Sequence, residues 1–408
     1  MQKPNHIVCC ALPAWEAAYL RSTVELMKCL SVDNLVLYVD YNYTFTDLVK
    51  GITGKKPFDW KRLLGLKSRL RKVSGDGQTG MYVLSLPPTL PAFAANTYKL
   101  FNVLCKINAV ITGFYINRAI RKLGMTDVIE FNAYQPFLGN RWKLINVHFK
   151  VSYIYDEFTG VPYFKGFAER EEKQYANAAD LVVVTSDVLK KRKQTKDTPI
   201  AVVNNGVHFD AFDGHKFNRS MQGASTKIVG YTGNIDDRLD VGLLQEVIKQ
   251  MPATAFVFIG KVFDNAIKAK LSKNRNVVFT PPVSAAEIPD LLTSMNVGII
   301  PYVCNDLTAA IYPLKANEYL AMGLPVVMTP FASIGEADKA VHFANSPESF
   351  VSALEFALEA DTLQAREARM ELAKEADWAV RAGQLINYVL QYKTSKRLKS
   401  NNYQTELI

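Results

Sequence analysis

The sequence predicts an α/β protein made of two doubly wound domains, and three observations support this prediction. The chain has 408 residues, whereas a usual domain has roughly 100–200 residues. Short, apolar, β-branched runs alternate with longer segments of helical period, which is typical of parallel sheets covered by helices. This alternation stops once, between residues 206 and 226, where the sequence is polar and aperiodic. We therefore expect two parallel sheets joined by a linker.

The first half alternates strands and helices from its beginning. Each predicted strand is a short apolar run bounded by turn-forming residues. The predicted strands span residues 6–12, 34–41, 81–86, 127–132, 150–155, 180–185 and 200–204. The predicted helices between them include residues 16–30, 92–123 and 165–178. We assign residues 1–206 to a first Rossmann-like domain and residues 207–226 to the linker.

The second half repeats the alternation and then becomes wholly helical. Its predicted strands span residues 227–232, 255–260, 277–280, 297–302, 326–329 and 341–344. We assign residues 227–375 to a second Rossmann-like domain. Residues 349–393 carry a continuous helical pattern without a further strand, so they must pack on a sheet already built, and a return to the first domain is one option. We expect the polar tail, residues 395–408, to be frayed.

The charge of the chain indicates an anionic partner. Lys and Arg outnumber Asp and Glu by 48 to 39, which gives a net charge of +9 and suits nucleic acid, phosphate-bearing ligands or an acidic membrane. One basic stretch holds Asp59 as its only acid, and its cations are Lys50, Lys55, Lys56, Lys61, Arg62, Lys67, Arg69, Arg71 and Lys72. Near-helical apolar spacing from Trp60 to Leu70 suits anionic lipid headgroups, and a solvated helix packed on its own domain is the alternative.

The cysteines and the N-terminus predict a reduced, cytoplasmic protein. The cysteines are Cys9, Cys10, Cys29, Cys105 and Cys304, an odd number without zinc-like spacing. The first apolar run, residues 7–12, is too short for a secretory signal or a membrane span. The apolar stretch at residues 100–116 is interrupted by polar residues, so we expect no transmembrane helix.

Two segments of the second half suit an anionic ligand. A strand-to-helix turn at residues 229–244 holds Gly233 and Asn234, whose amides can approach an anion, and Arg238, which can donate to phosphate. Asp236 and Asp237 are equally available to pair with this arginine. In the helix that follows Pro313, Lys315 and Glu318 share a face, and a surface ion pair is the alternative to a binding role. Since ligands bind at the carboxyl ends of parallel strands, we expect the site between the domains.

The order of several motifs in the second half resembles one family. They are GNIDDR at 233–238, FIGK at 258–261, PPVSAAEIPDLL at 281–292, GIIPY at 298–302 and PLKANEYLAMGLPVV at 313–327. This order is similar to the nucleotide-sugar-binding domain of GT-B glycosyltransferases, a large and mostly retaining family. The similarity extends to YDEF at 155–158 and to residues 178–189 and 202–212. It implies two Rossmann-like domains facing across a cleft, with residues 376–394 forming a helix that crosses back to the first, acceptor-binding domain.

The resemblance implies a donor site with defined roles. The family's second motif carboxylate falls on Glu318, which would bind the ribose hydroxyls, whereas its first falls on Ala310, where the carboxylate is missing. Lys315 and Arg238 would bind the diphosphate and stabilise its departing charge. The donor-binding residues implied are Gly233, Asn234, Arg238, Lys261, Val283, Tyr302, Lys315 and Glu318.

Three residues of the first half are candidates for catalysis. Asn132 stands where retaining members commonly have a histidine, and an amide can bind a sugar hydroxyl but cannot act as a base. Asp156 and Glu157 follow a predicted strand, and either could deprotonate an acceptor, with helix capping as the alternative. There is no Asp-x-Asp signature near the glycine turns, and the five histidines lack ligand spacing. We therefore predict no metal and no cofactor beyond the donor substrate.

The resemblance implies a retaining hexosyltransferase that takes a sugar from a nucleotide-diphosphate sugar, with UDP as the preferred carrier. Its partners would be that donor, a saccharide or polyprenyl-diphosphate-linked saccharide acceptor of cell-surface polysaccharide synthesis, and an anionic membrane. We expect it to be peripheral on the inner face of the cytoplasmic membrane and not to bind nucleic acid. The alternatives are an inactive nucleotide-sugar-binding scaffold and a nucleotide-sugar hydrolase or epimerase of the same fold.

Overall fold

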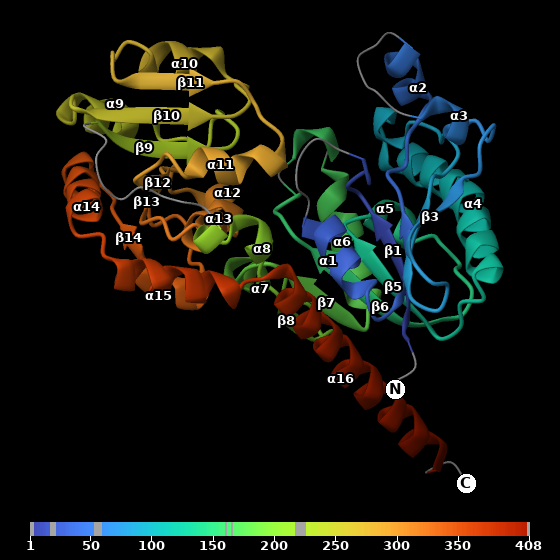
Figure 1. The fold of residues 1–408 in the computed structure, drawn as a ribbon. Coiled ribbons are helices and arrows are strands. Elements are labelled where there is room, and N and C mark those ends of the chain that lie inside the picture. Colours follow the sequence, from blue (N-terminus) through green and yellow to red (C-terminus); the bar gives the residue numbers. More distant parts are fainter. Residues whose placement is uncertain are drawn as a thin grey trace. The chain divides into compact units, whose positions relative to one another are not determined.

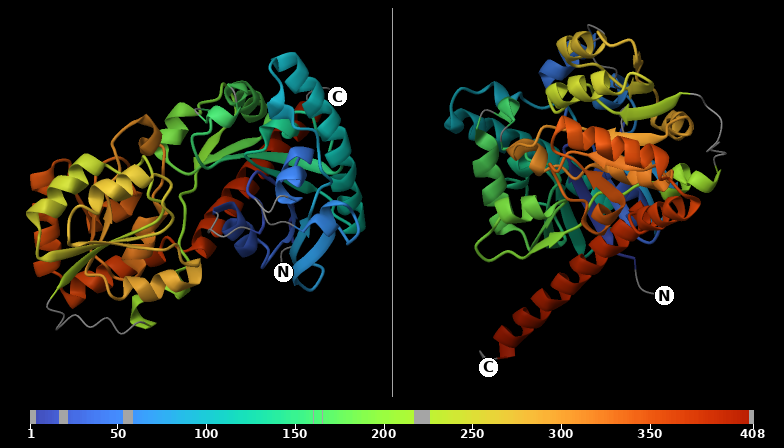
Figure 2. Two further views of the ribbon diagram at one scale, coloured as in Figure 1. Left: turned by 90° about the horizontal axis from the view of Figure 1, so that it is seen from above. Right: turned by 90° about the vertical axis from the view of Figure 1, so that its left-hand side faces the viewer.

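The protein consists of two compact units, which are described separately (Figure 1). The computed structural model describes residues 4–16, 22–52, 59–159, 161–164, 166–216 and 226–405. Unit 1 comprises Met1–Asn204 and Ala382–Ile408, and unit 2 comprises Asn205–Arg381. Each unit has its own sheet, and Figure 2 shows strands between layers of helices in both. The predicted class, two parallel-sheet domains, is confirmed.

The sheet of unit 1 has the strand order β3-β4-β2-β1-β5-β6-β7-β8. Its strands are β1 (His6–Ala11), β2 (Leu35–Val39), β3 (Leu70–Gly75), β4 (Gly80–Leu84), β5 (Val128–Ala133), β6 (Val147–Ile154), β7 (Leu181–Val184) and β8 (Ile200–Val202). All neighbours pair in parallel except β3, which runs antiparallel to β4. In the centre, Val8 pairs with Leu37 on one side and Glu130 on the other. The central strands are buried on both faces, which explains their continuous apolar sequences.

The helices of unit 1 cover both faces of this sheet (Figure 2). They are α1 (Ser22–Leu30), α2 (Phe45–Ile52), α3 (Trp60–Leu63), α4 (Tyr98–Lys122), α5 (Pro136–Gly139), α6 (Phe167–Ala178) and α7 (Asp187–Arg192). The predicted helices at 92–123 and 165–178 correspond to α4 and α6, and each begins a few residues later than predicted. Side-chain oxygens of Thr97 and Ser186 accept backbone N–H groups at the starts of α4 and α7, which fixes where these helices begin.

Helix α4 packs one face into unit 1 and leaves the other exposed. Phe101 and Ile116 are fully buried on the packed face. On the same face Asn108 exchanges hydrogen bonds with the backbone of Leu90, and the Trp142 indole donates to Thr112 at 2.8 Å. By length and composition alone α4 could cross a membrane, and it is the single described helix of which this is true. Its packed face, however, is part of the core of unit 1.

The basic segment differs from the prediction. Helix α3 ends at Leu63, so the predicted amphipathic helix from Trp60 to Leu70 is wrong beyond its first turn. The chain turns at Gly65, where φ is +81°, and enters the edge strand β3 at Leu70. The near-helical apolar spacing from Trp60 to Leu70 was misleading. An exposed edge strand such as β3 need not alternate apolar and polar residues, so its sequence showed no strand pattern against the helix. Lys55 and Lys56 lie outside the described residues.

The sheet of unit 2 has the strand order β11-β10-β9-β12-β13-β14, and the pairs are parallel. Its strands are β9 (Lys227–Thr232), β10 (Thr254–Ile259), β11 (Val277–Thr280), β12 (Val297–Ile300), β13 (Val326–Met328) and β14 (Val341–Phe343). This is the 3-2-1-4-5-6 order of doubly wound dinucleotide-binding folds. The connections reverse direction between β9 and β12, and ligands of such folds bind at the carboxyl ends of those strands.

The helices of unit 2 are α8 (Phe209–Phe212), α9 (Val241–Gln250), α10 (Asn265–Leu271), α11 (Ile288–Leu292), α12 (Asp306–Ala309), α13 (Leu314–Ala321), α14 (Pro347–Glu359) and α15 (Leu363–Lys374). Close packing against small residues positions α13. A Cβ at Gly298 of β12 would lie 2.4 Å from the Tyr319 ring, so only glycine lets this tyrosine lie on the strand. Tyr319 then accepts the backbone N–H of Thr232 at 2.9 Å, which ties α13 to the end of β9.

The first part of the predicted linker is structured within unit 2. Phe212 of α8 is buried, and the carbonyl oxygen of Gly214 accepts from Arg366 at 2.6 Å. The backbone of Val207 pairs with Ala376 and Trp378. Residues 217–225 lie outside the described residues.

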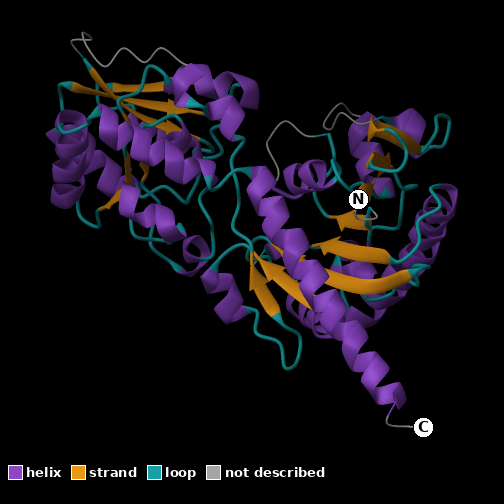
Figure 3. Cartoon of the chain, turned by 60° about the horizontal axis from the view of Figure 1, so that its bottom comes forward, coloured by secondary structure: helices purple, strands orange, loops and turns teal. Residues whose placement is uncertain are grey.

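The C-terminal region, predicted to be helical at 349–393 without a further strand, consists of three helices separated by two short breaks, and the helix predicted at 376–394 corresponds to the last of them. Thr362 caps the start of α15, and a turn after Lys374 precedes α16 (Trp378–Thr405). Helix α16 begins in unit 2 and is assigned to unit 1 from Ala382 onward, and Figure 3 shows it as one uninterrupted helix. Lys393 and Arg397 bind Asp127 just before β5 at 2.8 and 2.7 Å. The predicted fraying from residue 395 is therefore wrong as far as Thr405.

Candidate functional site

The carboxyl ends of β9 and β10 in unit 2 form a pair of glycine turns. Gly233 follows β9 with φ +140°, and Gly260 follows β10 with φ +146°. A Cβ at Gly260 would lie 2.0 Å from the carbonyl oxygen of Gly233, so the two turns touch through bare backbone. These are the positions where a glycine is required, because any side chain would collide with backbone in a conformation that L-residues rarely adopt.

Lys315 reaches from α13 to this glycine turn. A Cβ at Gly233 would lie 2.3 Å from Cε of Lys315 and 2.7 Å from Nζ. The ammonium donates to the Tyr302 hydroxyl at 3.1 Å and faces the rings of Tyr231 and Tyr302 at 5.5 and 5.7 Å. The structure therefore brings Gly233, Tyr302 and Lys315 together at the switch point, as the sequence order predicts. Lys315 does not use Glu318 as its hydrogen-bond partner, which disfavours the surface ion pair.

Two buried tyrosines support this ammonium group. The hydroxyls of Tyr231 and Tyr302 lie 3.3 Å apart, and Tyr231 donates to the carbonyl oxygen of Asn234 at 2.8 Å. Burial would raise the pKa of Tyr302, but the nearby Lys315 and Arg238 cations outweigh it and hold this pKa below its ordinary value. The N–H groups of Gly233 and Ile235 already donate to the carbonyl oxygens of Ile259 and Lys261, so it is the positive charge of the two side chains beside the turn that suits a phosphate.

Arg238 borders the same site but already has a carboxylate partner. Its Nε and Nη2 donate to the two oxygens of Asp236 at 2.9 and 2.6 Å. Its guanidinium also lies 5.4 Å from the centre of the Tyr302 ring. Of the two partners that the sequence offered, Asp236 is therefore the one that Arg238 uses. The hydrogen bonds to Asp236 hold the guanidinium beside Tyr302, and the Asp236 carboxylate would compete with a phosphate for it.

Glu318 lies one helical turn after Lys315 and is partly buried. Burial raises the pKa of Glu318 to about 7, against the opposing attraction of Lys315 and His208. A carboxylate in such surroundings gains from hydroxyl donors that replace its lost water. Ala310, the position of the missing first carboxylate, is fully buried directly after α12. Glu318 is thus the acidic side chain that the predicted motif retains.

The other predicted donor residues lie less close to Lys315. The Lys261 carbonyl oxygen accepts from Ile235 at 2.9 Å, which joins the two turns, while its exposed ammonium lies 4.6 Å from the centre of the Phe263 ring. Asn234 contributes its carbonyl oxygen to Tyr231. Val283, after β11, packs against the core of unit 2. Sequence reasoning missed Tyr231 and Tyr319, although a tyrosine next to a strand-ending glycine turn was a usable signal.

In unit 1, Asn132 is part of a local turn. It is buried in β5; its amide donates to the carbonyl oxygen of Gln135 at 3.1 Å and accepts the Gln135 N–H at 2.7 Å. A Cβ at Gly139 would lie 2.4 Å from the same amide. The side chain of Asn132 therefore closes the turn between β5 and α5.

Glu157 is held in an ion-pair network after β6. It accepts from the Lys193 ammonium at 2.5 Å and from the Thr159 hydroxyl at 2.6 Å, and Lys193 also pairs with Glu172 at 2.8 Å. Burial would raise the pKa of Glu157, but Lys193 and Thr159 together lower it. A carboxylate stabilised in this way is a poor proton acceptor. Asp156 accepts the backbone N–H of Glu157 at 2.8 Å, which corresponds to a turn-forming role.

An aromatic cavity of about 50 Å³ lies at the carboxyl edge of the unit 1 sheet. Its lining includes Leu12 after β1, Tyr41 after β2 and Gln135 after β5, together with Phe93 and Tyr163. Aromatic faces with a few polar groups are typical of surfaces that bind saccharides or other partly apolar ligands. Asn132 acts on this cavity indirectly, because its side chain orients Gln135, which lines the cavity.

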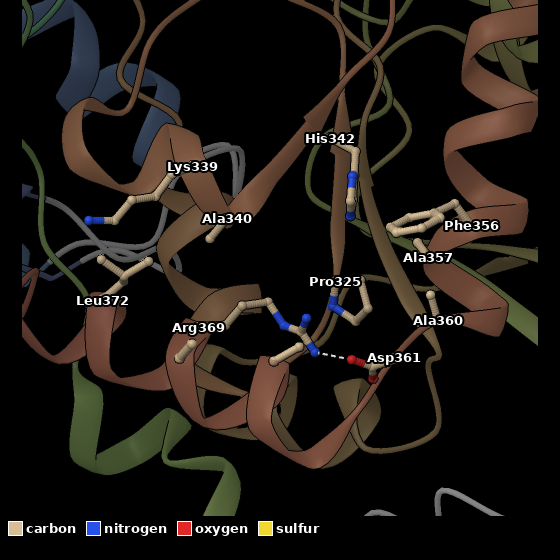
Figure 4. A pocket seen from close by; sticks show the side chains of 12 residues that line it. Pro325, Lys339, Ala340, His342, Phe356, Ala357, Ala360, Asp361, Arg369 and Leu372 are labelled. Carbon is tan, nitrogen blue, oxygen red and sulfur yellow. Dashed lines mark hydrogen bonds and ion pairs between the residues drawn. The ribbon is translucent and has the colours of Figure 1, made fainter.

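A larger cavity in unit 2, about 400 Å³, lies away from the glycine turns (Figure 4). Pro325, directly before β13, and His342 of β14 line it, so it opens at the opposite edge of the sheet. Its Arg369 is bound to Asp361 and to the carbonyl oxygen of Gly323. These contacts are structural. Within the described ranges, no group of three or more His, Cys, Asp or Glu side chains is arranged for a metal ion; metal independence stays a prediction.

Comparison with known proteins identifies the fold and one domain. Residues 226–360 match the family Glycosyl transferases group 1. The chain is similar to sucrose-phosphate synthase from Thermosynechococcus elongatus, with TM-score 0.65 and 15% identity over 96% of this chain and 100% of that one. A structure from E. coli described as trehalose-6-phosphate bound with UDP-2-fluoro glucose gives TM-score 0.62 at 11% identity, covering 95% and 99%. The chain has the GT-B fold, and its residues 226–360 are similar to a group 1 glycosyltransferase domain.

A curated protein is also similar to this chain in sequence. It is a Bacillus subtilis (strain 168) protein provisionally named teichuronic acid biosynthesis glycosyltransferase TuaH, 29% identical over 231 residues. The match spans 53% of this chain and 58% of that relative. The predicted resemblance to GT-B glycosyltransferases is confirmed. The group 1 domain contains Gly233, Arg238, Lys315 and Glu318, whereas Asn132 and Glu157 lie outside it.

Proposed function

We propose that the protein transfers a sugar from a nucleotide-diphosphate sugar, UDP-linked, to a saccharide or lipid-linked saccharide acceptor in cell-surface polysaccharide synthesis. The observation that carries this proposal is the Lys315 ammonium beside the Gly233 turn, with the Glu318 carboxyl one helical turn further along α13. An unpaired cation and a carboxyl at a switch point fit the diphosphate and ribose of one ligand. The names of the similar proteins support a UDP-sugar donor and a polysaccharide product.

In this proposal Lys315 holds the donor diphosphate beside the Gly233 turn, and Arg238 assists from its place beside Asp236. Glu318 binds the ribose hydroxyls. As the bond between the sugar carbon and the diphosphate oxygen breaks, negative charge grows on that oxygen, and Lys315 stabilises it more strongly than in the bound donor. The acceptor hydroxyl bonds to the sugar carbon and passes its proton to the departing phosphate. This route retains configuration and uses neither a metal nor a protein base.

The proposal also includes a peripheral location on the inner face of the cytoplasmic membrane, where lipid-linked acceptors would be available. The cations of β3 and α3 support it, because each can contribute about 1 kcal/mol near an anionic surface.

Donor hydrolysis tests the activity directly. The purified protein is incubated with a panel of nucleotide sugars, and released nucleoside diphosphate is measured with and without a chelator. Slow release from one UDP-sugar, unaffected by chelator and abolished in Lys315→Ala, is the expected result. The matched control is Lys249→Ala, which removes an exposed cation of α9. Release that survives Lys315→Ala would contradict the assigned site.

A second candidate function is a donor-binding scaffold without transfer activity. The buried Ala310 and the ion-paired Glu157 favour it, because neither offers a reactive carboxylate. Under this alternative the protein binds UDP with dependence on Lys315 but hydrolyses none of the donors. Any turnover that depends on Lys315 rejects it.

A further inference from the structure

Residues 65–70 and the last turns of α4 enclose a pocket in unit 1 of about 400 Å³. The chain that was predicted to be one amphipathic helix instead folds back, and in Figure 1 β3 lies beside α4. The pocket is lined by Gly65, Leu66, Lys67, Ser68, Arg69, Leu70, Leu84, Tyr115, Arg118, Ala119 and Lys122. Nothing in the proposed transfer reaction uses it.

The pocket is strongly cationic. Lys67, Arg69, Arg118 and Lys122 line it, and no carboxylate is among the lining residues. The nearest acid in the sequence of this segment, Asp59, pairs with Arg62 at 3.5 Å and with Lys67 at 3.7 Å. Lys67 is therefore partly compensated, whereas Arg69, Arg118 and Lys122 have no carboxylate in the pocket lining, and such positive charge in a concave surface attracts anions.

Arg69 has an unused donor in this pocket. Its guanidinium lies 5.2 Å from the centre of the Tyr115 ring, and the flexible end of the side chain lies over Gly65. Its Nη1 is buried and has no hydrogen-bond partner among the described residues. A buried donor that lost its water is costly to leave unpaired. An anionic oxygen in the pocket would satisfy this donor, and a phosphate group has the oxygens to bridge Arg69 and its neighbours.

An exposed apolar stripe on α4 leads to the same pocket. Val103, Ile107, Val110, Ile111 and Phe114 recur at helical spacing and are exposed, Val110 by 75% and Phe114 by 58%. Arg118, Arg121 and Lys122 continue this face toward the C-terminal end of the helix, and α4 contains no Asp or Glu. Apolar residues that end in cations have the composition of helices that lie in a membrane interface.

We propose that this pocket binds the phosphate of an anionic phospholipid headgroup while the exposed stripe of α4 enters the boundary between headgroups and acyl chains. A free phosphate would explain the cations but not the adjoining apolar stripe, and charge complementarity favours an anionic surface over an apolar one. The inference rests on the membrane location in the proposed function and gives it a defined site. It is independent of the donor site in unit 2.

Vesicle binding tests the inference. The full-length protein is sedimented with vesicles of phosphatidylcholine alone and of phosphatidylcholine with phosphatidylglycerol at 3:1. Wild type should pellet with the anionic vesicles only. Arg118→Ser/Lys122→Ser should bind them about 25-fold more weakly, since each cation near the surface accounts for about fivefold. Lys190→Ser/Lys191→Ser, which removes two exposed cations of α7 in the same unit, should stay within about threefold of wild type.

Two further variants separate the pocket from the stripe. Val110→Ser/Phe114→Ser should lose the vesicle binding that survives at high salt, because apolar insertion is not screened by ions. Arg69→Gln should weaken binding of glycerol 3-phosphate, measured by calorimetry, while thermal unfolding stays close to that of wild type. Equal losses of vesicle binding in Arg118→Ser/Lys122→Ser and Lys190→Ser/Lys191→Ser would overturn the pocket. Unchanged vesicle binding at high salt in Val110→Ser/Phe114→Ser would overturn insertion.

The remaining outcomes distinguish the lipid site from the proposed transfer activity. If wild type binds glycerol 3-phosphate but not anionic vesicles, the occupant is a free phosphate compound and the lipid proposal is wrong. If vesicle binding follows the expected pattern while donor hydrolysis is absent, the lipid site stands and the proposed transfer fails. If hydrolysis depends on Lys315 but vesicles are not bound, the transfer stands and this inference fails.

Discussion

The two sheets differ in how the charged side chains near the carboxyl ends of their strands are paired. At the unit 1 edge, Glu157 and Glu172 share Lys193 at 2.5 and 2.8 Å. At the unit 2 edge, Lys315 has a tyrosine hydroxyl as its hydrogen-bond partner, and the Glu318 carboxyl has a raised pKa. Charged groups in direct ion pairs are already satisfied by the protein, whereas an ammonium and a carboxyl that make no direct ion pair with each other gain from a ligand. The difference supports the proposed donor site in unit 2.

The largest expected effect tests the unit 1 half of this comparison. Lys193→Ala leaves Glu172 without its cation and Glu157 with only the more distant Arg192, at 3.9 Å, in a largely buried network, so the free energy of unfolding should fall by about 3–5 kcal/mol. Chemical denaturation followed by circular dichroism measures the loss. Lys190→Ala, an exposed change on the helix that ends just before Lys193, should alter stability by less than about 0.5 kcal/mol. If Lys193→Ala is as stable as wild type but Glu157→Gln abolishes transfer, the unit 1 edge is catalytic and the comparison breaks.

The next effect tests the unit 2 half. Lys315→Ala removes a charge-assisted contact to phosphate and should weaken UDP binding by about 1.5–3 kcal/mol while leaving uridine binding unchanged. Isothermal calorimetry with both ligands gives the two numbers. Lys249→Ala serves as the control. An equal loss for UDP and uridine would show that Lys315 supports the nucleoside or the fold rather than the diphosphate.

The pKa of Glu318 gives a third test. Because this pKa is raised to about 7, the folded state holds a proton that the unfolded state releases near its ordinary pKa. Its contribution to stability is therefore complete below about pH 4.5 and is lost as the pH rises toward 7. Ribose binding needs the carboxylate, so uridine affinity should rise about tenfold from pH 6 to pH 8. Uridine carries no phosphate, which isolates this carboxyl. A flat profile, or the same profile in Glu318→Gln, would reject the ribose role.

Arg238 should show the smallest effect and sharpen the contrast. Since Asp236 already binds its guanidinium, Arg238→Ala should weaken UDP binding by about 1 kcal/mol or less, within the range of a partly compensated contact. Asp236→Asn should instead tighten UDP binding, because it releases the guanidinium. Calorimetry at constant ionic strength measures both variants. A larger loss for Arg238→Ala than for Lys315→Ala would reverse the order of the two cations.

Much of the fold could be predicted, because strands of a parallel sheet buried on both faces have continuous apolar sequences. The strands at 227–232 and 277–280 have the predicted bounds. Strand β3 was missed because its sequence, LRKVSG, is cationic and exposed at an edge. The break before α15 was missed because the residues there are compatible with a helix, and the capping of α15 by Thr362 depends on local geometry.

The candidate site was predicted where sequence order determines it and missed where long-range packing does. Lys315 meets the Gly233 turn because α13 follows a strand next to β9, which the fold class already implies. The pairing of Glu157 with Lys193, 36 positions later, depends on how α7 packs and leaves no local pattern. The support from Tyr319 is likewise tertiary, since it requires the missing side chain of Gly298.

The course of α16 has a consequence for synthesis of the chain on the ribosome. Unit 1 is discontinuous: residues 205–381, which form unit 2, are made between its two segments. At about 5–20 residues per second, this interval lasts roughly 10–35 s. During that time Asp127 and Asp180 lack their α16 cations, Lys393, Arg397 and Lys396. Unit 2 can therefore mature while unit 1 still awaits its last helix, and a nascent chain that stops at Arg381 would leave the amino edge of the first sheet open to the quality-control proteases of the cell.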